Sequence, residues 1–336
     1  MKNEIKIGII GLGGIAQLVH LPILSKFKRV KISAVSEIKK SRLKAVADKF
    51  HIDNRYTDYG ELLKKDDCDA VIIATPTNLH HEISVAALNA GKHVLVEKPV
   101  ARNYEEALGI RKAAETNRKF VMIGMNLRFR PDTMLLKSLL NSKELGEIFY
   151  VRTSWLRKQS SSEDWFLSKN KAGGGVIIDL GLILLDLALW LLAYPKCKTV
   201  SVESFFHRTK DVEDSALGML RFDGGKVISF EASWSLLSER DDLKLSVYGD
   251  QGTAHLNPLK AYKLIGENKI DMTPAFASNP KNLYKKSYEN ELRHFVSSIV
   301  DPSHVHSSID EGISRMKLLE ALYKSAELEE EIKVNF

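Results

Sequence analysis

The sequence predicts an α/β protein in which a doubly wound parallel sheet precedes an α+β domain with a mostly antiparallel open sheet. Short β-branched runs alternate with amphipathic segments from residue 5 to about 125, which is typical of strand–helix–strand units. Apolar residues in these runs are continuous and do not alternate with polar ones, as expected for strands buried on both faces. After residue 126 strands follow one another through short turns such as Asp223-Gly224-Gly225. A chain of 336 residues has room for two domains, which we place at residues 1–125 and 126–336.

The first domain contains five predicted strands with helical patterns between them. The strands are Ile5 to Ile10, Val30 to Val35, Ala70 to Ala74, His93 to Glu97 and Phe120 to Met125. The helices are Ile15 to Lys26, Ser41 to Phe50, His80 to Ala90 and Tyr104 to Thr116. Parallel strands need such crossover helices, so this half is predicted to be a Rossmann-like sheet.

The second domain is predicted to contain a long apolar helix, then a sheet, then a closing helix. These elements lie near Gly174 to Leu192, Thr199 to His207, Ser215 to Phe222, Lys226 to Ser233, Leu243 to Tyr248 and Ser308 to Glu331. Asp179 and Asp186 would be expensive in lipid, so we expect the apolar helix to be buried in protein, with no membrane contact. Ile228, Phe230 and Trp234 are expected to form an exposed sheet face that a homodimer or homotetramer buries.

The composition argues against several other classes of protein. The 49 Lys and Arg and 43 Asp and Glu residues give a formal charge of +6, but the two signs are interleaved, so no nucleic-acid surface is expected. Cys68 and Cys197 lie outside any metal-ligand spacing, which predicts no metal site and two inert thiols in a reducing compartment. The first residues lack the pattern of a signal peptide, and we expect a cytoplasmic location.

The segment Gly11-Leu-Gly-Gly-Ile-Ala16, between the first strand and the first helix, carries the strongest functional signal. Gly11 permits a tight turn, Gly13 lets backbone amides approach a pyrophosphate, and Ala16 allows close packing of the helix on the strand. Gly14 and Ile15 complete the predicted contact segment. This context favours dinucleotide binding over a merely structural turn.

Glu37 follows the second strand and bears on the choice of dinucleotide. Its carboxylate can accept hydrogen bonds from the adenosine ribose and repel a 2′-phosphate, which favours NAD over NADP. Lys39, Lys40 and Arg42 stand close enough to bind that phosphate if Glu37 swings away. NAD is therefore predicted, and NADP stays open.

Further candidates stand at the carboxyl ends of two later strands, where doubly wound sheets bind ligands. The predicted cofactor contacts after the third strand are Ala74, Thr75, Pro76, Asn78 and His80. Asn78 is equally suited to cap a helix, and His80 to satisfy a local hydrogen bond. Glu97 and Lys98 follow at the end of the fourth strand, where an ammonium group can polarise a substrate oxygen. Lys98 is the first candidate for catalysis.

Four segments together resemble the Gfo/Idh/MocA oxidoreductase family, over essentially the whole chain. They are the glycine turn, A-T-P-T-N-L-H-H at residues 74–81, E-K-P at 97–99 and G-G-G-V-I-I-D-L-G at 173–181. The resemblance implies NAD or NADP in the first domain, and a sugar, cyclitol or related polyol in the second, which also makes oligomer contacts. It implies that Lys98 is the catalytic lysine, and that Asn126 and Arg128 lie in a segment that approaches the active site.

The resemblance also implies that Asp179 faces the reacting oxygen together with a histidine four residues later, one helical turn away. This chain has Ile183 at that position. Loss of a positioned general base typically costs roughly 10² to 10⁴ in rate. Asp179 and Lys98 are the remaining candidates to accept the proton.

Other residues of the second domain are candidates for the substrate pocket. One group, able to stack on a sugar ring or clamp it, comprises Trp155, Arg157, Trp165 and Phe166. The other stands at helical spacing and resembles a late helix of the family, with Tyr288, Glu291 and His294. The first group is equally suited to filling a core, and the second to a surface helix with one buried face.

Three functions remain open. The first is an NAD-dependent dehydrogenase or reductase for a sugar, cyclitol or polyol. The second is a cofactor-binding regulatory protein without turnover, which the isoleucine at position 183 favours. The third is chemistry with tightly held NAD that is reduced and reoxidised in one cycle.

Overall fold

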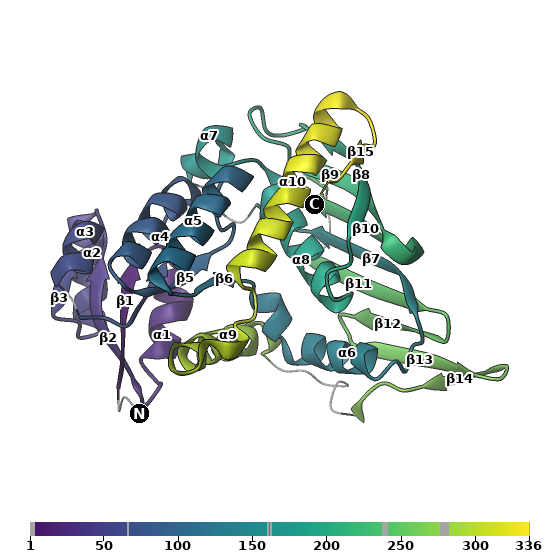
Figure 1. Ribbon diagram of the computed structural model, residues 1–336, viewed down its shortest axis with the longest axis horizontal. Helices are drawn as coiled ribbons and strands as arrows, with labels where there is room; N and C mark the ends of the chain where they lie inside the picture. The colour runs from purple at the N-terminus through teal and green to yellow at the C-terminus, as the bar shows by residue number, and fades with distance from the viewer. Residues whose placement is uncertain are drawn as a thin grey trace. The chain divides into compact units, whose positions relative to one another are not determined.

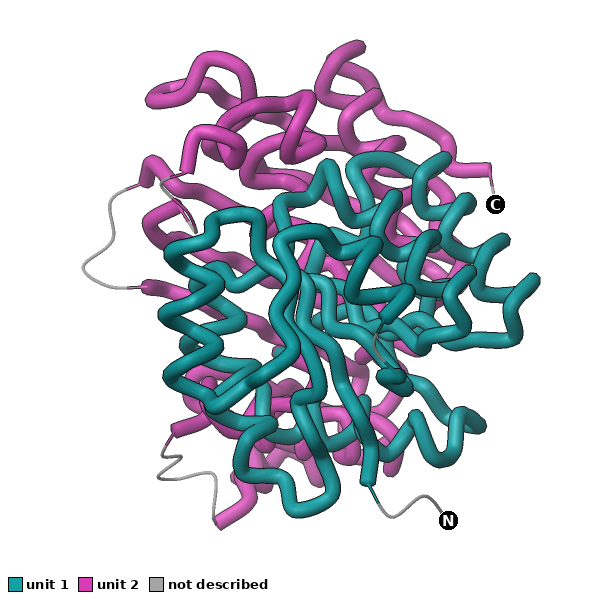
Figure 2. Tube along the Cα trace, turned by 90° about the vertical axis from the view of Figure 1, so that its left-hand side faces the viewer, with its two compact units in different colours: residues 1–126, 288–314 teal, residues 127–287, 315–336 magenta. Residues whose placement is uncertain are grey.

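The computed structural model describes residues 4–65, 67–159, 161, 163–236, 241–275 and 282–335. The chain forms two compact units, and neither is continuous in sequence (Figure 2). The first contains residues 1–126 and 288–314, and the second contains residues 127–287 and 315–336. A single boundary after residue 125 therefore does not describe the chain, because residues 288–314 belong to the first unit.

The return of residues 288–314 to the first unit has a local physical cause. Phe295 packs edge to face on Phe120, with 5.9 Å between the ring centroids. The backbone amide of Ile123 donates to the carbonyl oxygen of Ser307 at 2.9 Å, next to an isolated bridge between Met122 and Ser308. The last strand of the first sheet is therefore covered by a segment that comes from far along the chain.

The first unit contains a parallel sheet of six strands in the order β3-β2-β1-β4-β5-β6 (Figure 1). The strands are β1 (Ile5–Ile10), β2 (Val30–Ser36), β3 (Asn54–Tyr56), β4 (Ala70–Ile73), β5 (His93–Glu97) and β6 (Val121–Gly124). The predicted doubly wound sheet is confirmed. The strand order reverses between β1 and β4, the point at which such sheets bind ligands. The sequence did not predict β3, which is short and mostly exposed.

The helices of the first unit are α1 (Leu21–Leu24), α2 (Lys40–Lys49), α3 (Tyr59–Lys65), α4 (His80–Asn89), α5 (Tyr104–Asn117) and most of α9 (Leu283–Val300). The predicted helix from Ile15 to Lys26 is only partly α-helical in the structure. It begins as a π-helical turn over Ala16–His20 and ends as α1, a single α-helical turn. Such π turns are rare and frequent at functional sites.

The second unit contains a nine-stranded sheet in the order β14-β13-β12-β11-β7-β10-β9-β8-β15. The strands are β7 (Ile148–Leu156), β8 (Cys197–Phe205), β9 (Ser215–Phe222), β10 (Val227–Ser233), β11 (Asp242–Gly249), β12 (Gly252–Leu256), β13 (Lys260–Ile265), β14 (Asn268–Asp271) and β15 (Ile332–Lys333). The pairs are antiparallel except β7 with β10, so the predicted sheet type is confirmed. The remaining longer helices are α6 (Pro131–Asn141), α8 (Leu182–Leu191) and α10 (Ile309–Leu328), which spans both units.

The predicted apolar helix is a core helix of the second unit. Within the predicted range, Gly174 to Leu192, it consists of a π turn over Ile177–Gly181 and α8, and a short helix α7 (Lys169–Ala172) precedes it. The stretch Lys169–Leu191 is long and apolar enough to cross a membrane, but 94% of its most apolar window is buried inside the protein. Burial in the fold therefore accounts for its composition.

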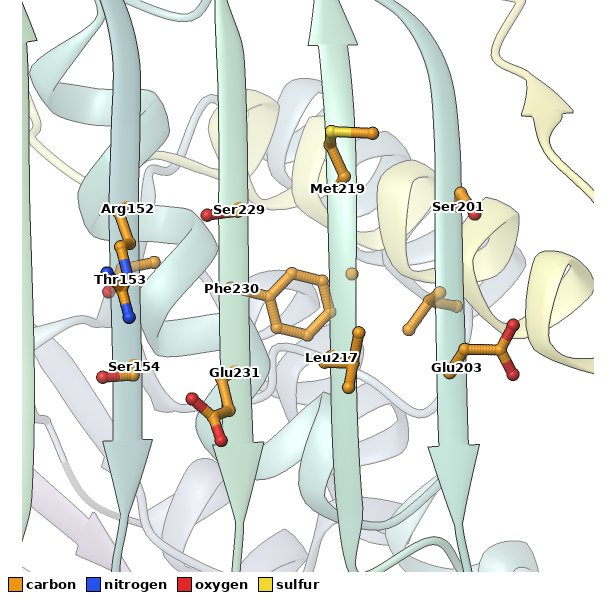
Figure 3. A pocket seen from close by; sticks show the side chains of 12 residues that line it. Arg152, Thr153, Ser154, Ser201, Glu203, Leu217, Met219, Ser229, Phe230 and Glu231 are labelled. Atoms are coloured by element: carbon orange, nitrogen blue, oxygen red, sulfur yellow. The ribbon is translucent and has the colours of Figure 1, made fainter.

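The prediction that Ile228, Phe230 and Trp234 form an exposed face of the sheet is wrong. Ile228, Phe230 and Trp234 are 0%, 3% and 8% exposed, because β10 turns them toward the π turn and α8. The opposite face of the sheet carries Ser229 and Leu217, with polar and charged neighbours (Figure 3). Side chains alternate along a strand, so a run containing Ile, Phe and Trp does not by itself reveal which face is covered.

Candidate active site

The glycine turn of the first unit forms a cradle that a side chain would fill. Gly11 has a φ of +90°, and a Cβ atom there would lie 2.5 Å from the carbonyl oxygen of Ala74. The space at Gly13 and Gly14 is open, with nothing within 4 Å of a Cβ at Gly14. Backbone amides at the start of the π turn are therefore accessible to a close-fitting anionic group such as a pyrophosphate.

Glu37 is held in place by donors on both carboxylate oxygens. Its Oε2 accepts from the amide of Leu12 at 3.1 Å and from Arg42 Nη1 at 3.4 Å, and its Oε1 accepts from the amide of Lys39 at 2.9 Å. The side chain is 6% exposed. The outward swing that would free Arg42 for a 2′-phosphate must break these hydrogen bonds.

Thr75 stands at the end of β4, beside the glycine cradle. Its methyl carbon would lie 3.0 Å from a Cβ at Gly11. Among the described residues, its buried Oγ1 has no hydrogen-bond partner. Buried hydroxyls are normally paired, so this atom fits a contact to a bound ligand.

Asn78 and His80 follow in a short 3₁₀ turn and at the start of α4. Asn78 lies inside the turn Thr77–Leu79, and Leu79 is the N-cap of α4, so the alternative of Asn78 as helix cap is wrong. His80 is buried, with Nδ1 2.7 Å from the carbonyl oxygen of Pro99 and Nε2 2.9 Å from that of Thr75. Burial lowers the pKa of His80, although both carbonyls oppose the shift. His80 therefore braces the ends of β4 and β5 against each other.

Lys98 directly follows β5 and is half-buried. The side chain of its neighbour Glu97 is fixed by a contact with a histidine. The Nε2 atom of His20, at the end of the π turn, lies 2.8 Å from Glu97 Oε1. His20 is fully buried. The helix that begins at the glycine cradle is thus tied to the strand end that carries the candidate catalytic lysine.

The second unit places Asp179 in the π turn that precedes α8. Asp179 is 3% exposed, and its Oδ2 accepts a hydrogen bond from the indole Nε1 of Trp234 at 3.1 Å. Ile183 lies in the first turn of α8 and is 8% exposed. No sequence pattern predicted the contact with Trp234, which is 55 residues away along the chain.

Glu213 holds the start of the same π turn. Its Oε1 accepts from the amides of Gly175 and Ile177 at 3.0 and 2.9 Å and from the hydroxyl of Tyr323 at 2.9 Å. A Cβ at Gly175 would lie 2.0 Å from the carbonyl oxygen of Glu213, so this approach requires glycine. Burial raises the pKa of Glu213, against the pull of these donors.

The aromatic candidates separate into two kinds. Trp155 is 8% exposed and is covered by Arg157, whose guanidinium carbon lies 5.2 Å from the indole centroid. Trp165 and Phe166 are half-buried, with ring centroids 5.5 Å apart, and Phe166 lies 5.3 Å from Trp234. A row of rings therefore leads from Trp165 to the indole that contacts Asp179, and Trp155 is a core residue beside Arg157.

Arg128 occupies a buried ionic cluster in the second unit. It is 2% exposed, and its Nε donates to Asp186 Oδ2 at 2.8 Å. Arg315 donates to Asp186 Oδ1 at 2.6 Å and to the hydroxyl of Tyr194 at 2.8 Å. Asp186 gives Arg128 a fixed partner within the fold, and the expected contact of Arg128 with a cofactor or substrate stays a prediction. Asn126, in contrast, is the last residue of the first segment of unit one.

The late-helix candidates lie on α9 in the first unit. Tyr288 and Glu291 are buried with Phe295, which gives α9 one buried face at helical spacing. His294 stacks on His306 at 4.7 Å, and burial lowers its pKa to about 4. The structure therefore agrees with the alternative of a helix with one buried face.

Comparison with known protein families decides the affiliation of the chain. Residues 5–125 match the family described as "Oxidoreductase family, NAD-binding Rossmann fold", and residues 133–255 match the GFO/IDH/MocA C-terminal domain. The chain belongs to the Gfo/Idh/MocA oxidoreductase family. The resemblance predicted from the sequence is confirmed, and the first unit contains an NAD-binding Rossmann domain.

Relatives of similar length support the same affiliation. D-glucoside 3-dehydrogenase of Escherichia coli (strain K12) is 28% identical over 345 residues, which cover 97% of this chain and 96% of that protein. Myo-inositol 2-dehydrogenase of Thermotoga maritima is 24% identical, with 98% of each chain covered. A solved structure of GenD2 from gentamicin A biosynthesis, in complex with NAD, is 25% identical and covers 99% of this chain and 97% of that chain, with a TM-score of 0.87.

The residues of this Gfo/Idh/MocA member fit NAD. The cradle at Gly11 and Gly13 leaves room for a pyrophosphate. Thr75 Oγ1, which has no hydrogen-bond partner in the part of the chain that the structure describes, stands beside it. Glu37 supplies carboxylate oxygens after β2, at the position where a ribose is bound in such sheets. Glycine cradle, Thr75 and Glu37 would together hold the dinucleotide.

Proposed function

We propose that this protein is an NAD-dependent dehydrogenase or reductase that acts on a hydroxyl of a sugar, cyclitol or related polyol. The observation that carries the proposal is the preserved cofactor cradle followed by Lys98 at the end of β5. The relatives named for glucoside and inositol dehydrogenation span almost the whole chain and support this substrate class.

The two residues that the family resemblance assigns to catalysis, Lys98 and Asp179, carry the proposed chemistry. NAD, when bound, supplies the acceptor or donor of the hydride. Lys98 polarises the reacting oxygen of the substrate through its ammonium charge, and Asp179 orients the hydroxyl by accepting a hydrogen bond. Ile183 has no polar atom and takes no part in proton transfer. While Lys98 carries its ammonium charge, the hydroxyl proton passes to Asp179, and a neutral Lys98 amine is the alternative acceptor.

We propose a preference for NAD over NADP. Glu37 accepts three hydrogen bonds, and one of them comes from Arg42, a sequence candidate for binding a 2′-phosphate. Glu37→Ala should free Arg42 and narrow the difference between the dissociation constants of NADH and NADPH. Fluorescence titrations with both cofactors measure that ratio, and a wild-type preference for NADPH would contradict the proposal.

The experiment for the main proposal is a panel of sugars, cyclitols and polyols with NAD and NADP, followed by NADH absorbance. Binding of the cofactor is verified first by titration, so that an inactive preparation is recognised. We expect turnover with at least one polyol, and Lys98→Met should lower it roughly 10²- to 10³-fold. No absorbance change with any compound, despite bound cofactor, would overturn the dehydrogenase proposal.

A regulatory protein without turnover is the second candidate, and Ile183 is the observation that favours it. Such a protein would bind NADH and a sugar together and convert neither. The same panel distinguishes the two, because calorimetric binding of a sugar without turnover supports regulation. Turnover that is lost in Lys98→Met excludes it.

We further propose a cytoplasmic homo-oligomer that binds neither nucleic acid nor membranes. Cys68 and Cys197 are buried thiols, and burial raises the pKa of Cys197 to about 12, so neither is suited to exchange chemistry. Leu217, 51% exposed, lies on the open sheet face beside Met219 (Figure 3). Light scattering should give a mass above one chain, and Leu217→Lys should lower it.

A further inference from the structure

Trp234 gives Asp179 a donor from a different element of the fold. The indole Nε1 lies 3.1 Å from Asp179 Oδ2, and the two residues are 8% and 3% exposed. An indole has one N–H donor and no acceptor, so it can hold a carboxylate oxygen but can neither take nor supply a proton for catalysis. Its effect on Asp179 is therefore one of orientation.

Both partners of this hydrogen bond are fixed by other contacts. The amide of Trp234 donates to the carbonyl oxygen of Asp214 at 2.8 Å, and its ring lies 5.3 Å from that of Phe166. The amide of Asp179 donates to the carbonyl oxygen of Gly175 at 3.0 Å, and Gly175 is held by Glu213. The backbones of both residues are therefore fixed by their own contacts, and the hydrogen bond from Trp234 orients the Asp179 carboxylate.

Ile183 makes this contact important in this chain. It lies one helical turn after Asp179, where a side chain shares the same helix face, and it offers no hydrogen-bonding atom. The isoleucine side chain therefore cannot orient the Asp179 carboxylate through a hydrogen bond. The end of β10 supplies a donor through Trp234 instead.

We infer that Trp234 is a positioning residue for the dehydrogenation, and this inference rests on the function proposed above. In that reaction the substrate carbon loses a hydride to NAD, the hydroxyl loses its proton to a base, and a carbonyl forms. Trp234 holds the Asp179 carboxylate in the orientation that engages the hydroxyl. It contacts neither the hydride nor the proton.

A positioning role predicts a loss in turnover without a matching loss in binding. Trp234→Phe keeps an aromatic ring near Phe166 and removes the N–H donor. Hydrogen bonds to charged groups are strong enough that kcat should fall roughly 10- to 100-fold, with KM for the polyol changing less than about 3-fold. Trp190→Phe, the same substitution on α8, is the matched control and should keep kcat.

A second variant separates the donor from the shape of the side chain. Replacement of Trp234 by 3-benzothienylalanine keeps the bicyclic ring and exchanges the N–H for sulfur. It should reproduce the kcat loss of Trp234→Phe. Wild-type kcat in this variant would overturn the inference, even if Trp234→Phe is poorly folded.

The contact itself has a readout that needs no turnover. The chain has four tryptophans, so a ¹⁵N-edited NMR spectrum contains four indole N–H signals, and Trp234→Phe identifies the one from Trp234. Asp179→Asn should move that signal and leave the Trp190 signal in place. A Trp234 signal unmoved by Asp179→Asn would overturn the inference.

The outcomes also separate this inference from the proposed function. An active wild type whose kcat is unchanged in both Trp234 variants overturns the positioning role alone. A wild type without turnover on the polyol panel, despite bound NADH, overturns the proposed function and the positioning role with it. In that case a Trp234 signal that still responds to Asp179→Asn shows that the hydrogen bond exists without a catalytic task.

Discussion

The cofactor cradle of the first unit and the surroundings of Asp179 in the second unit depend on different parts of the chain. At the cradle the backbone makes the site, since Gly11 must be glycine because of its φ of +90° and its approach to Ala74. Around Asp179 the site is made by side chains from distant segments, with Trp234 after β10 and Glu213 before β9. A backbone site is encoded locally, whereas a side-chain site requires the finished fold.

The largest effect that sharpens this comparison is expected for Lys98→Met. The substitution should lower kcat roughly 10²- to 10³-fold, because a charged group that stabilises the reacting oxygen is lost. The dissociation constant of NADH should change little, since the cradle is untouched. Lys92→Met, just before the amino end of the same strand β5, is the control and should keep wild-type kinetics. Equal losses of kcat in both variants would mean that the substitutions act by disturbing strand β5 and not by removing the Lys98 charge from the reacting oxygen.

Gly11→Ala tests the claim that backbone geometry makes the cradle. Its Cβ would lie 2.5 Å from the Ala74 carbonyl oxygen at a φ of +90°, so the turn must move, and NADH affinity should fall roughly 100-fold. Gly266→Ala has a comparable positive φ with nothing within 4 Å, and it should leave NADH binding unchanged. Fluorescence titration measures the NADH affinity of both variants. Equal NADH affinities would contradict the claim that the backbone at Gly11 makes the cradle.

Ile183→His tests whether the second unit tolerates a polar side chain one helical turn after Asp179. Partial burial of an imidazole in place of isoleucine should cost about 1 to 3 kcal/mol of unfolding free energy. A histidine that takes part in proton transfer should also add a limb to the pH profile of kcat near its ordinary pKa of about 6.5. Urea unfolding and pH–rate profiles test both. Ile183→Val is the control, with a smaller apolar change and no new limb expected.

The smallest expected effect concerns Glu213, at the start of the π turn. Burial raises the pKa of Glu213 in the folded protein, so the folded state binds its proton more tightly than the unfolded chain does. The stability from this group is fully present below the unfolded pKa and is lost as pH rises through the folded pKa. Glu213→Gln removes that dependence. Urea unfolding from pH 4 to 8 should show wild-type stability falling relative to the variant, and parallel curves would contradict the assignment.

Much of the first unit was predictable because its signals are local. Runs such as Ile5–Ile10, in which Lys6 is the one charged residue and the apolar residues do not alternate with polar ones, indicate a strand buried on both faces, and the glycines mark the turn that follows. The short strand β3 was missed because Asn54–Tyr56 has no apolar run. The cap predicted at Asn78 was wrong because a 3₁₀ turn precedes α4.

The second unit shows where such reasoning ends. Ile228, Phe230 and Trp234 were correctly recognised as one apolar face of a sheet, but that face packs on α8 and the π turn. Arg128 carries no sequence signal for Asp186, which lies 58 residues further along the chain. The hydrophobic effect has no preferred direction, so a hydrophobic pattern predicts which residues are buried but does not identify the surface against which they pack.

The sequence by itself determined the sheet types, the dinucleotide turn and the family. Backbone conformation and side-chain periodicity are properties of neighbouring residues, so they can be read from the chain. Only the tertiary structure decided that residues 288–314 complete the first unit and that Trp234 donates to Asp179. Those arrangements depend on packing between segments that are distant in sequence, which local propensities do not specify.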